Sequence, residues 1–573
     1  MMHPSPAIVA QAAVRPLPRK VLWLLCAVYV LAGFFGRDPW RGDDMQAFAF
    51  MREIALGQTN WLQPTLAGLG PDTPGLLPLW LGAGAIWLGQ GWLSMEATSR
   101  LPFVALLVLV LASTWRAAWR LAQSPQAQPV AFAFGGEARA VDYARAMADA
   151  ALLALIATLG LAQFSHEATS YLSQLAGTAL LLSGSAAWLH RPGGRALAAT
   201  LGGVALLALS GAPTMALLLA AGAAAVASRA RTPDGTPIGL SRTLIAFAAQ
   251  TAAIAVLAGW TQAWQWRLAL PANAQSWATL VRLLVWFAWP TWLLALWTLW
   301  RWRHPLRHGA SHIVLPLWFA LVPVVAAFAT EPADRALLQG LPALAILAAF
   351  ALPTLKRGVA AAIDWFTLLF FSVCAIAIWV IWLAVQTGFP AQPAANVARL
   401  APGFQSRFEP LAFLLALAAT LAWCALVRWR TARHRPAIWK SLVLPAGGAA
   451  LGWVLLMTLW LPLLDYGRSY APQVRLLREA VDKVEPASRL RSGDCVAGYG
   501  LDQPLVAALR YYGQLPMATP EQAPTCRWAI VDPDGDWAAG QVFADAQWQQ
   551  AAIVTRPTDR RDQLVLMLRH PAH

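Results

Sequence analysis

The chain has 573 residues, of which 58% are hydrophobic and only 12% are charged, and its mean hydropathy is +0.51. A soluble domain carries about 25% charged residues, so this composition excludes an ordinary soluble protein. The net charge of +15 is compatible with nucleic-acid binding, but the basic residues lie in short loops between apolar runs, where membrane proteins carry their orientation signals. We therefore reject nucleic acid as a partner and expect a membrane protein.

Apolar runs of about 18 residues or more recur from Val21 to Leu464, and each is long enough to cross the hydrocarbon core of a bilayer. The first run follows Arg15, Arg19 and Lys20 and is not followed by a small-residue cleavage site, so we interpret it as an uncleaved first span. The runs predict about thirteen spans: 21–36, 101–121, 144–164, 170–189, 196–209, 213–229, 242–264, 278–300, 312–330, 336–354, 363–387, 410–428 and 441–463.

The basic loops set the expected orientation. Lys and Arg concentrate on the cytoplasmic side of membrane proteins, and thirteen spans with a cytoplasmic N-terminus place all the basic loops on that side. The apolar run 75–93 would break this pattern if it were a span. It contains Pro74, Pro78 and several glycines, so we expect it to lie in the outer interface or to be partly re-entrant. A single broken helix at Ser210 to Pro213 is an alternative to two spans there.

The last hundred residues have a different character. Segments 494–499, 527–532 and 563–568 resemble strands, and 503–512 resembles a helix that ends at Gly513. The spacing of Cys495 and Cys526 fits no zinc pattern, so a disulfide is expected if this part is extracytoplasmic. We therefore divide the chain into a cytoplasmic N-terminus (1–20), an all-α polytopic membrane domain (21–464) with its first outer loop at 37–100, and a small extracytoplasmic α/β domain (465–573).

Ionisable residues near the hydrocarbon mark functional sites in membrane proteins. The predicted topology collects three groups of them at the outer face. The acidic pair beside the Trp-rich first loop is the strongest candidate, whereas any single residue elsewhere in the set could simply cap a helix or contact water. The groups are Asp38, Arg41, Asp43, Asp44, Arg52, Glu53 and Asp72; His166 and Glu167; and Glu331, Asp334 and Arg335.

The first outer loop resembles that of the GT-C glycosyltransferases, in particular the lipid A aminoarabinose transferases and the protein O-mannosyltransferases. The shared order is an acidic pair after the first span, an Arg-Glu pair, a Gly-to-Trp segment, a Pro-rich amphipathic helix and an Arg-Leu-Pro start of the next span. Here these are Asp43-Asp44, Arg52-Glu53, Gly57 to Trp61, Pro74 to Trp92 and Arg100-Leu101-Pro102. The segment Glu331 to Leu344 resembles the late outer loop of the family.

The resemblance implies transfer of a sugar from a polyprenyl-phosphate donor to an acceptor on a lipid, a glycan or a protein. It implies two catalytic acids, Asp43 as the base and Asp44 to orient the acceptor or support Asp43, and it implies Arg335 as partner of the leaving phosphate. Substrate contacts are expected from Arg52, Asp72, His166, Glu167, Glu331 and Arg335. The family's three phosphate-contacting lysines are replaced here by Thr73, Ser210 and Thr330.

The sequence contains no P-loop, GxSxG or HExxH motif, so we expect neither a nucleotide nor an obligatory metal. The expected location is the bacterial inner membrane, with the C-terminal domain in the periplasm. Two other classes remain open: a transporter or flippase of lipid-linked sugars, for which no clear internal repeat is evident, and an inactive scaffold, which the missing lysines would fit.

Overall fold

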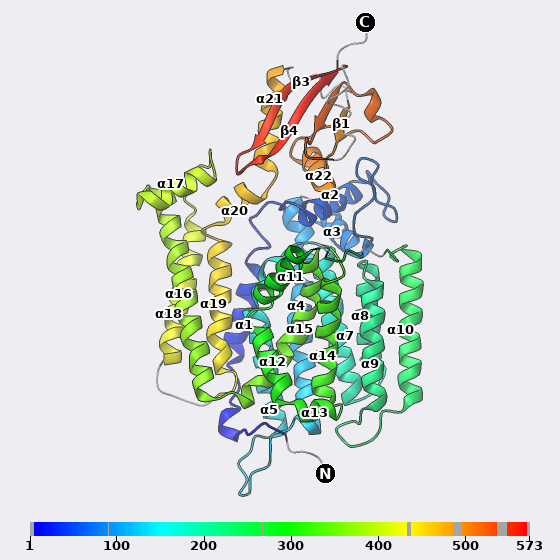
Figure 1. The fold of residues 1–573 in the computed structure, drawn as a ribbon, viewed down its shortest axis with the longest axis vertical. Coiled ribbons are helices and arrows are strands. Elements are labelled where there is room, and N and C mark those ends of the chain that lie inside the picture. Colours follow the sequence, from blue (N-terminus) through cyan, green and yellow to red (C-terminus); the bar gives the residue numbers. More distant parts are fainter. Residues whose placement is uncertain are drawn as a thin grey trace.

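The structure is a computed structural model that describes residues 5–89, 91–265, 268–271, 273–431, 437–484, 495–535 and 547–569. A bundle of upright helices carries a small domain with a β-sheet at one end (Figure 1). The C-terminus lies beyond that domain, and the N-terminus lies at the opposite end of the bundle. The predicted class, an all-α membrane protein with a small C-terminal α/β domain, is confirmed.

Each predicted span coincides with a helix or with a pair of helices. By length and apolar composition, six of the described helices could cross a membrane alone, or up to eight if each bent pair is one span. The helices of the bundle are α1 (Arg19–Leu31), α4 (Met95–Ala122), α5 (Ala140–Ala157), α6 (Leu159–Phe164), α7 (Ser170–His190), α8 (Gly194–Leu209), α9 (Pro213–Arg229), α10 (Leu240–Trp260), α11 (Ala274–Phe287), α12 (Thr291–Arg301), α13 (Arg303–Arg307), α14 (Ser311–Ala327), α15 (Ala333–Ala351), α16 (Arg357–Thr387), α18 (Pro410–Thr431) and α19 (Lys440–Leu456).

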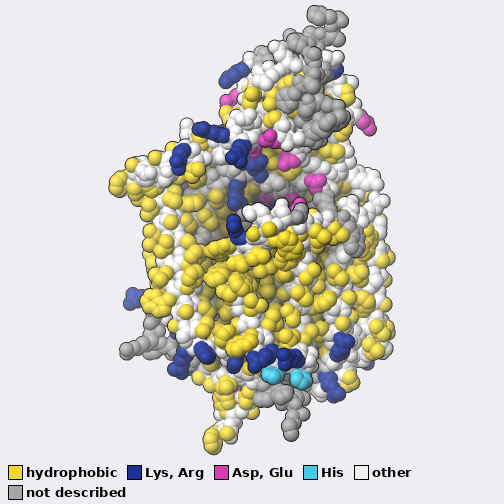
Figure 2. Space-filling view, viewed as in Figure 1, with side chains coloured by type: hydrophobic (Ala, Val, Ile, Leu, Met, Phe, Trp, Pro, Cys, Tyr) yellow, Lys and Arg dark blue, Asp and Glu magenta, His cyan; other side chains and the backbone are white. Residues whose placement is uncertain are grey.

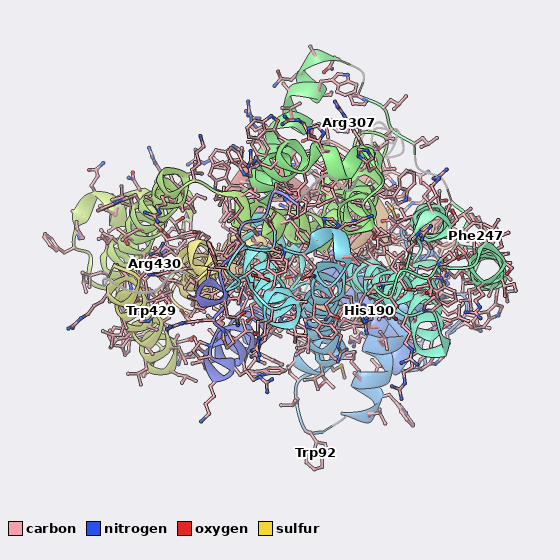
Figure 3. The ribbon with its side chains drawn as sticks, turned by 90° about the horizontal axis from the view of Figure 1, so that it is seen from below. Trp92, His190, Phe247, Arg307, Trp429 and Arg430 are labelled. Atoms are coloured by element: carbon pink, nitrogen blue, oxygen red, sulfur yellow. A yellow bond between two sulfur atoms is a disulfide. The ribbon has the colours of Figure 1, made fainter. Side chains whose placement is uncertain are left out.

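Burial separates the centre of the bundle from its flanks. The apolar windows of α7 and α15 are each 83% buried, whereas those of α16 and α18 are 17% and 11% buried. Seen from below, α18 with Trp429 and α10 with Phe247 form opposite flanks (Figure 3). Hydrophobic side chains cover the middle of the molecule, and Lys and Arg gather at the end away from the β-sheet (Figure 2). This surface suits a lipid environment.

Two details differ from the simplest prediction, and a third decides between two alternatives. Segment 278–300 is not one straight span, because α11 and α12 meet at an angle of 87° next to Pro290, which has no backbone N–H to continue a helix. Helices α8 and α9 lie side by side (Figure 1) and turn at Ser210 and Gly211, where Gly211 has a φ of +84°. They are thus two helices and not one broken helix. The span expected at 144–164 is divided into α5 and α6 at Thr158.

Helices α2 (Asp43–Ala55) and α3 (Leu76–Leu88) lie between the bundle and the C-terminal domain (Figure 1). The predicted interfacial segment 75–93 therefore contains α3, at the end of the bundle. Close packing requires glycine here: a Cβ on Gly82 of α3 would lie 2.2 Å from Met51 Sδ of α2. The two helices form a platform under the C-terminal domain.

The C-terminal domain is a mixed four-stranded sheet in the order β1-β2-β4-β3. β1 and β2 are parallel and are joined through α22, whereas β4 is antiparallel to both β2 and β3. Cys495 and Cys526 form a disulfide with their Cα atoms 5.1 Å apart. Strand β3 was not predicted, because exposed and buried residues do not alternate regularly along it. The elements are α20 (Leu461–Arg468), α21 (Ala471–Val484), β1 (Val496–Tyr499), α22 (Gln503–Tyr511), β2 (Trp528–Val531), β3 (Trp548–Arg556) and β4 (Asp559–Arg569).

The remaining described elements are short and connect the larger ones. They are α17 (Ala391–Leu400) and the 3-10 turns η1 (Gln11–Ala13), η2 (Pro125–Ala127), η3 (Leu352–Thr354) and η4 (Ala523–Thr525).

Candidate active site

Asp43 lies at the start of α2, where the backbone N–H groups of a first helical turn favour negative charge. Its Oδ2 lies 3.0 Å from Arg335 Nη2, and Arg335 Nη1 lies 3.2 Å from Glu167 Oε2. The Asp43 side chain is 32% exposed, whereas that of Glu167 is 5% exposed. One guanidinium thus connects an accessible carboxylate to a buried one, and Asp43 Oδ1 accepts no hydrogen bond from the described residues.

Phe164 holds Arg335 in place, with the guanidinium carbon 3.9 Å from the ring centroid. Gln163 donates a hydrogen bond of 3.1 Å to Glu167 Oε1 and fixes that carboxylate. Glu167, which follows α6, therefore contacts Arg335 at the start of α15, and Arg335 in turn contacts Asp43 at the start of α2. The structure brings together Asp43, Glu167 and Arg335, which the sequence analysis drew from three separate outer loops.

Asp44 occupies a different environment, because its carboxylate is fully engaged by the protein. Arg37 Nη1 lies 2.7 Å from Asp44 Oδ2, and Arg100 Nη2 lies 3.8 Å from the same oxygen. The backbone N–H groups of Trp40 and Ala168 donate to its two oxygens at 3.0 and 3.1 Å. Asp44 is 2% exposed, so its geometry suits a structural centre that ties the first outer loop to the bundle.

The electrostatics separate the two members of the acidic pair. Burial raises the pKa of Asp43 by more than Arg335 lowers it, which makes this carboxylate a better proton acceptor near neutral pH. Burial would also raise the pKa of Asp44, but Arg37 and Arg100 outweigh it and hold that pKa below its usual value. Burial raises the pKa of Glu167 above its ordinary range despite Arg335.

His166 does not face this group. It is 1% exposed and packs among Tyr29, Phe34 and Trp453. Its Nε2 lies 2.9 Å from the carbonyl oxygen of Tyr29. Burial lowers the pKa of His166 to about 4, so the ring is neutral at physiological pH and its position suits packing.

Arg52 and Glu53 lie at the other end of α2. Arg52 Nη1 lies 3.2 Å from Glu53 Oε1, and Arg510 of α22 reaches Glu53 Oε2 at 3.0 Å. Arg52 also lies over the ring of Tyr511, at 5.7 Å. These contacts join α2 to the C-terminal domain. The predicted substrate contact Arg52 is thus placed away from the Asp43 group.

The other predicted contacts are more dispersed. Asp72 accepts a hydrogen bond of 3.0 Å from Gln46, which also bonds to Gln503 of the C-terminal domain. Glu331 is exposed and forms no ion pair with any described residue. Asp72 is therefore part of the platform, and Glu331 stands apart.

A cavity of about 440 Å³ opens between the bundle and the C-terminal domain. Its wall includes Arg335 and Glu167, so the Asp43 group borders it. Acidic and basic side chains are visible at this junction in Figure 2. The remaining lining comes from segments far apart in the sequence: Trp40, Arg41, Gln163, Gly467, Arg468, Arg556, Thr558 and Asp559.

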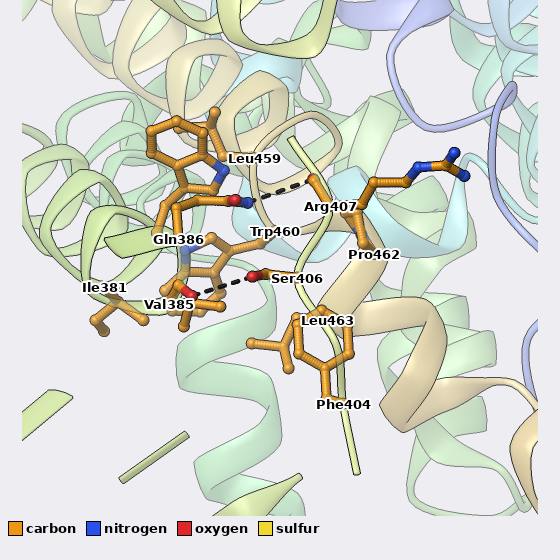
Figure 4. Close-up of a pocket in the computed structure, with 11 residues that line it drawn as sticks. Ile381, Val385, Gln386, Phe404, Ser406, Arg407, Leu459, Trp460, Pro462 and Leu463 are labelled. Atoms are coloured by element: carbon orange, nitrogen blue, oxygen red, sulfur yellow. Dashed lines mark hydrogen bonds between the residues drawn. The ribbon is translucent and has the colours of Figure 1, made fainter. Parts of the chain in front are cut away.

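A second pocket lies among α16, α19 and α20 (Figure 4). Its free space is only about 20 Å³, which is room for a single water. Ser406 closes it by donating a 3.1 Å hydrogen bond to the Val385 carbonyl oxygen. This pocket is too small for a substrate.

The positions where the family has lysines are partly brought together. Thr73 packs against the turn between α8 and α9, since a Cβ on Gly211 would lie 3.3 Å from Thr73 Cγ2. Ser210 is fully buried, and its carbonyl oxygen accepts a hydrogen bond from Gln174. Thr330 donates to the Ala326 carbonyl oxygen at the end of α14. None of these side chains is cationic, so positive charge at this site comes from arginines.

Sequence reasoning missed four arginines near the site. Arg37 and Arg100 hold Asp44, and Arg468 and Arg556 line the cavity. Arg468 carried a usable signal, because it follows the last span on the face expected to be poor in Lys and Arg. Arg556 carried none, because its position depends on the fold of the C-terminal domain.

No protein-family model matches the sequence, and no curated protein matches it. Among the solved structures that match the chain, two cover nearly its whole length. The crystal structure of ArnT from Cupriavidus metallidurans in the apo state has a TM-score of 0.60 and 14% identity, and the match covers 96% of this chain and 98% of that one. The structure of the same protein bound to undecaprenyl phosphate has the same TM-score and identity, covering 96% and 97%. The chain therefore has the fold of these ArnT structures.

Proposed function

We propose that this chain is a membrane glycosyltransferase that moves a sugar from a polyprenyl-phosphate carrier to an acceptor at the membrane face that carries the C-terminal domain. The observation that carries the proposal is Asp43, an accessible carboxylate of raised pKa, paired with Arg335 beside a polar cavity. The fold supports it, because a solved protein of this fold is bound to undecaprenyl phosphate.

In the proposed reaction, Asp43 Oδ1 accepts the proton of the acceptor hydroxyl or phosphate. The acceptor oxygen attacks the anomeric carbon and forms the new C–O bond. The bond between that carbon and the carrier phosphate breaks, and the phosphate oxygen keeps the electron pair. The products are the glycosylated acceptor, polyprenyl phosphate and protonated Asp43, which returns its proton to water.

Arg335 has two tasks in this scheme. A guanidinium pairs with phosphate through two parallel N–H donors, so Arg335 neutralises the charge that develops on the leaving phosphate. Its contact with Glu167 positions it before the substrate arrives. Because this cation and its neighbours supply positive charge, we expect neither a nucleotide nor an obligatory divalent metal.

The orientation follows from the distribution of charge. Arg and Lys gather at the end of the bundle opposite the C-terminal domain (Figure 2), and such an end faces the cytoplasm. We propose that the C-terminal domain lies in the periplasm of a bacterium and that the bundle lies in the inner membrane. The disulfide between Cys495 and Cys526 supports an oxidising compartment.

The test measures sugar transfer from radiolabelled polyprenyl-phosphate sugars to endogenous acceptors in membranes. Wild type is compared with Asp43→Asn and with the control Asp534→Asn, which changes an exposed acid in the C-terminal domain. We expect transfer with wild type and control but not with Asp43→Asn, at equal expression. The labelled product would then identify the acceptor.

Other outcomes would contradict the proposal in distinct ways. Equal transfer by Asp43→Asn would remove Asp43 from the mechanism and make Glu167 the next candidate for the base. No transfer with any of several donors would favour an inactive scaffold. Movement of lipid-linked sugar across proteoliposomes without transfer would favour a flippase.

A further inference from the structure

Beyond the Asp43 group, the same cavity has a second, cationic side. Arg41, Arg468 and Arg556 line it, and they come from the first outer loop, the end of α20 and the end of β3. The backbone N–H of Arg41 donates to the Arg468 carbonyl oxygen at 2.9 Å. Arg556 Nη2 donates to the carbonyl oxygen of the adjacent Gly467. The first outer loop and the end of β3 therefore both contact the end of α20, at Gly467 and Arg468.

The carboxylates near these arginines do not balance them. Arg41 Nη2 and Arg556 Nη1 share a single partner, Asp562 Oδ2, at 2.8 and 3.4 Å. Asp559 is the other acid on this side of the cavity. The cavity lining as a whole contains more basic than acidic side chains, which leaves an excess of positive charge at the wall. The basic ones are Arg41, Arg335, Arg468 and Arg556, and the acidic ones are Glu167 and Asp559.

Arg468 is the arginine available to a ligand. Among the described residues, no carboxylate lies within 4.0 Å of its guanidinium, and its side chain is exposed. Its guanidinium carbon lies 5.0 Å from the ring centroid of Trp40, and Arg37 lies over the same ring at 4.6 Å. A stacked guanidinium keeps its N–H donors in its own plane. Trp40 therefore holds Arg468 in place without using its donors.

We propose that Arg468, supported by Arg41 and Arg556, binds a phosphate group in this cavity, and that the C-terminal domain thereby completes the substrate site. The cavity is large enough, at about 440 Å³, and it also contains Arg335 and Glu167, so a phosphate held here lies in the same chamber as the Asp43 group. Arginine is suited to this task because its planar donors match phosphate oxygens.

This site also offers a source of positive charge in place of the missing lysines. Thr73, Ser210 and Thr330 offer no positive charge, whereas Arg41, Arg468 and Arg556 supply it at the cavity wall. The inference rests on the proposed function for the source of the phosphate, which belongs either to the polyprenyl carrier or to the acceptor.

The test measures binding to the full-length protein in nanodiscs, with undecaprenyl phosphate, uncharged undecaprenol and inorganic phosphate as probes. Arg468→Gln is compared with wild type and with Arg475→Gln, a control at an exposed arginine of α21. We expect wild type and control to prefer the phosphate-bearing probe, and Arg468→Gln to lose about tenfold or more of that preference. Arg468→Lys should restore part of it.

The probes distinguish the two sources of phosphate. Loss of the preference for undecaprenyl phosphate over undecaprenol assigns the site to the carrier phosphate. Loss of inorganic phosphate binding alone, with the lipid preference intact, assigns it to a phosphate on the acceptor. Arg468→Gln that binds every probe as wild type does would overturn the inference.

Two controls keep the result interpretable. Arg556 is 4% exposed, so Arg556→Gln is used only if its thermal unfolding matches wild type. Because binding is measured without sugar transfer, the two proposals can fail separately. A protein that binds phosphate through Arg468 but transfers no sugar retains this site and loses the proposed reaction.

Discussion

Arg335 Nη2 lies 3.0 Å from Asp43 Oδ2 and joins the first turn of α15 to the first turn of α2 across 292 positions of sequence. The other end of the same guanidinium contacts Glu167. A cation between an accessible and a buried carboxylate favours the ionised form of both. Movement of Arg335 toward a phosphate would weaken its hold on Asp43 and leave that carboxylate more basic.

Arg335→Gln should reduce both transfer and stability. The buried Glu167 would lose its cation, and removal of one partner of a buried ion pair costs about 3–5 kcal/mol. Thermal unfolding in detergent measures this loss. The double variant Arg335→Gln with Glu167→Gln should recover part of the stability but not the transfer. If the loss of unfolding free energy in the double variant equals the sum of the losses in the two single variants, the two residues are not coupled.

Asp44→Asn should destabilise the protein much more than Asp43→Asn. Asp44 is buried beside Arg37 and Arg100, so its loss leaves buried positive charge and costs about 3 kcal/mol or more. Asp43 is one-third exposed, and its replacement should leave the unfolding temperature nearly unchanged. Equal unfolding temperatures for the two variants would contradict the structural role of Asp44.

The same pair predicts a pH dependence of stability. The pKa of Asp44 is lower in the folded protein than its usual value. Its contribution is therefore present above an unfolded pKa of about 4 and is lost as pH falls through the folded pKa. The difference in unfolding free energy between wild type and Asp44→Asn should shrink in acid, measured at pH 7 and at successive lower values. If the difference in unfolding free energy between wild type and Asp44→Asn stays constant across this pH range, the structural role of Asp44 is contradicted.

The rate of sugar transfer should fall at low pH, and the pKa of Asp43 should set where it falls. The base works only when ionised, and burial raises its pKa above the usual value of about 4. The rate of transfer at low substrate should therefore fall as pH drops through a value above 4, and Asp43→Glu should shift the pH at which it falls. The measurement is initial rate against pH in isolated membranes. If Asp43→Glu does not shift the acid side of the pH–rate profile, the titrating group is a residue other than Asp43.

The disulfide should stabilise the C-terminal domain by about 3–4 kcal/mol, because it closes a loop between positions 31 residues apart. Thiol labelling of the denatured, unreduced protein should detect the three cysteines Cys26, Cys374 and Cys424, and reduction should add two. Cys526→Ser should lower the resistance of the domain to proteolysis, whereas Cys374→Ser should not. Five labelled thiols before reduction would show that the bond does not form in cells.

Local patterns determined much of the fold. An apolar run of sufficient length predicts a membrane helix wherever it is placed, so the predicted spans coincide with helices or helix pairs. The segments expected as strands at 494–499 and 527–532 contain β1 and β2, and 563–568 lies within β4, because short apolar runs carry their own local signal. Asp43 was identified in the same way, as an acid at the outer end of a span.

Only the tertiary structure decided what each polar residue does. Asp43 and Asp44 are neighbours in sequence, yet Asp43 is one-third exposed and pairs with Arg335, whereas Asp44 is enclosed by Arg37 and Arg100. Adjacent residues on a helix point about 100° apart, and what each then meets depends on packing between distant segments.

The cationic wall shows this limit most clearly. Arg41, Arg468 and Arg556 lie in three segments far apart in the sequence and share no local motif, so no sequence pattern could join them. The sequence by itself determined a many-helix membrane protein with an acidic pair after its first span, because burial of apolar side chains depends on composition and spacing. The convergence of charges depends on long-range packing, and only the folded chain places those three arginines in one cavity with Arg335.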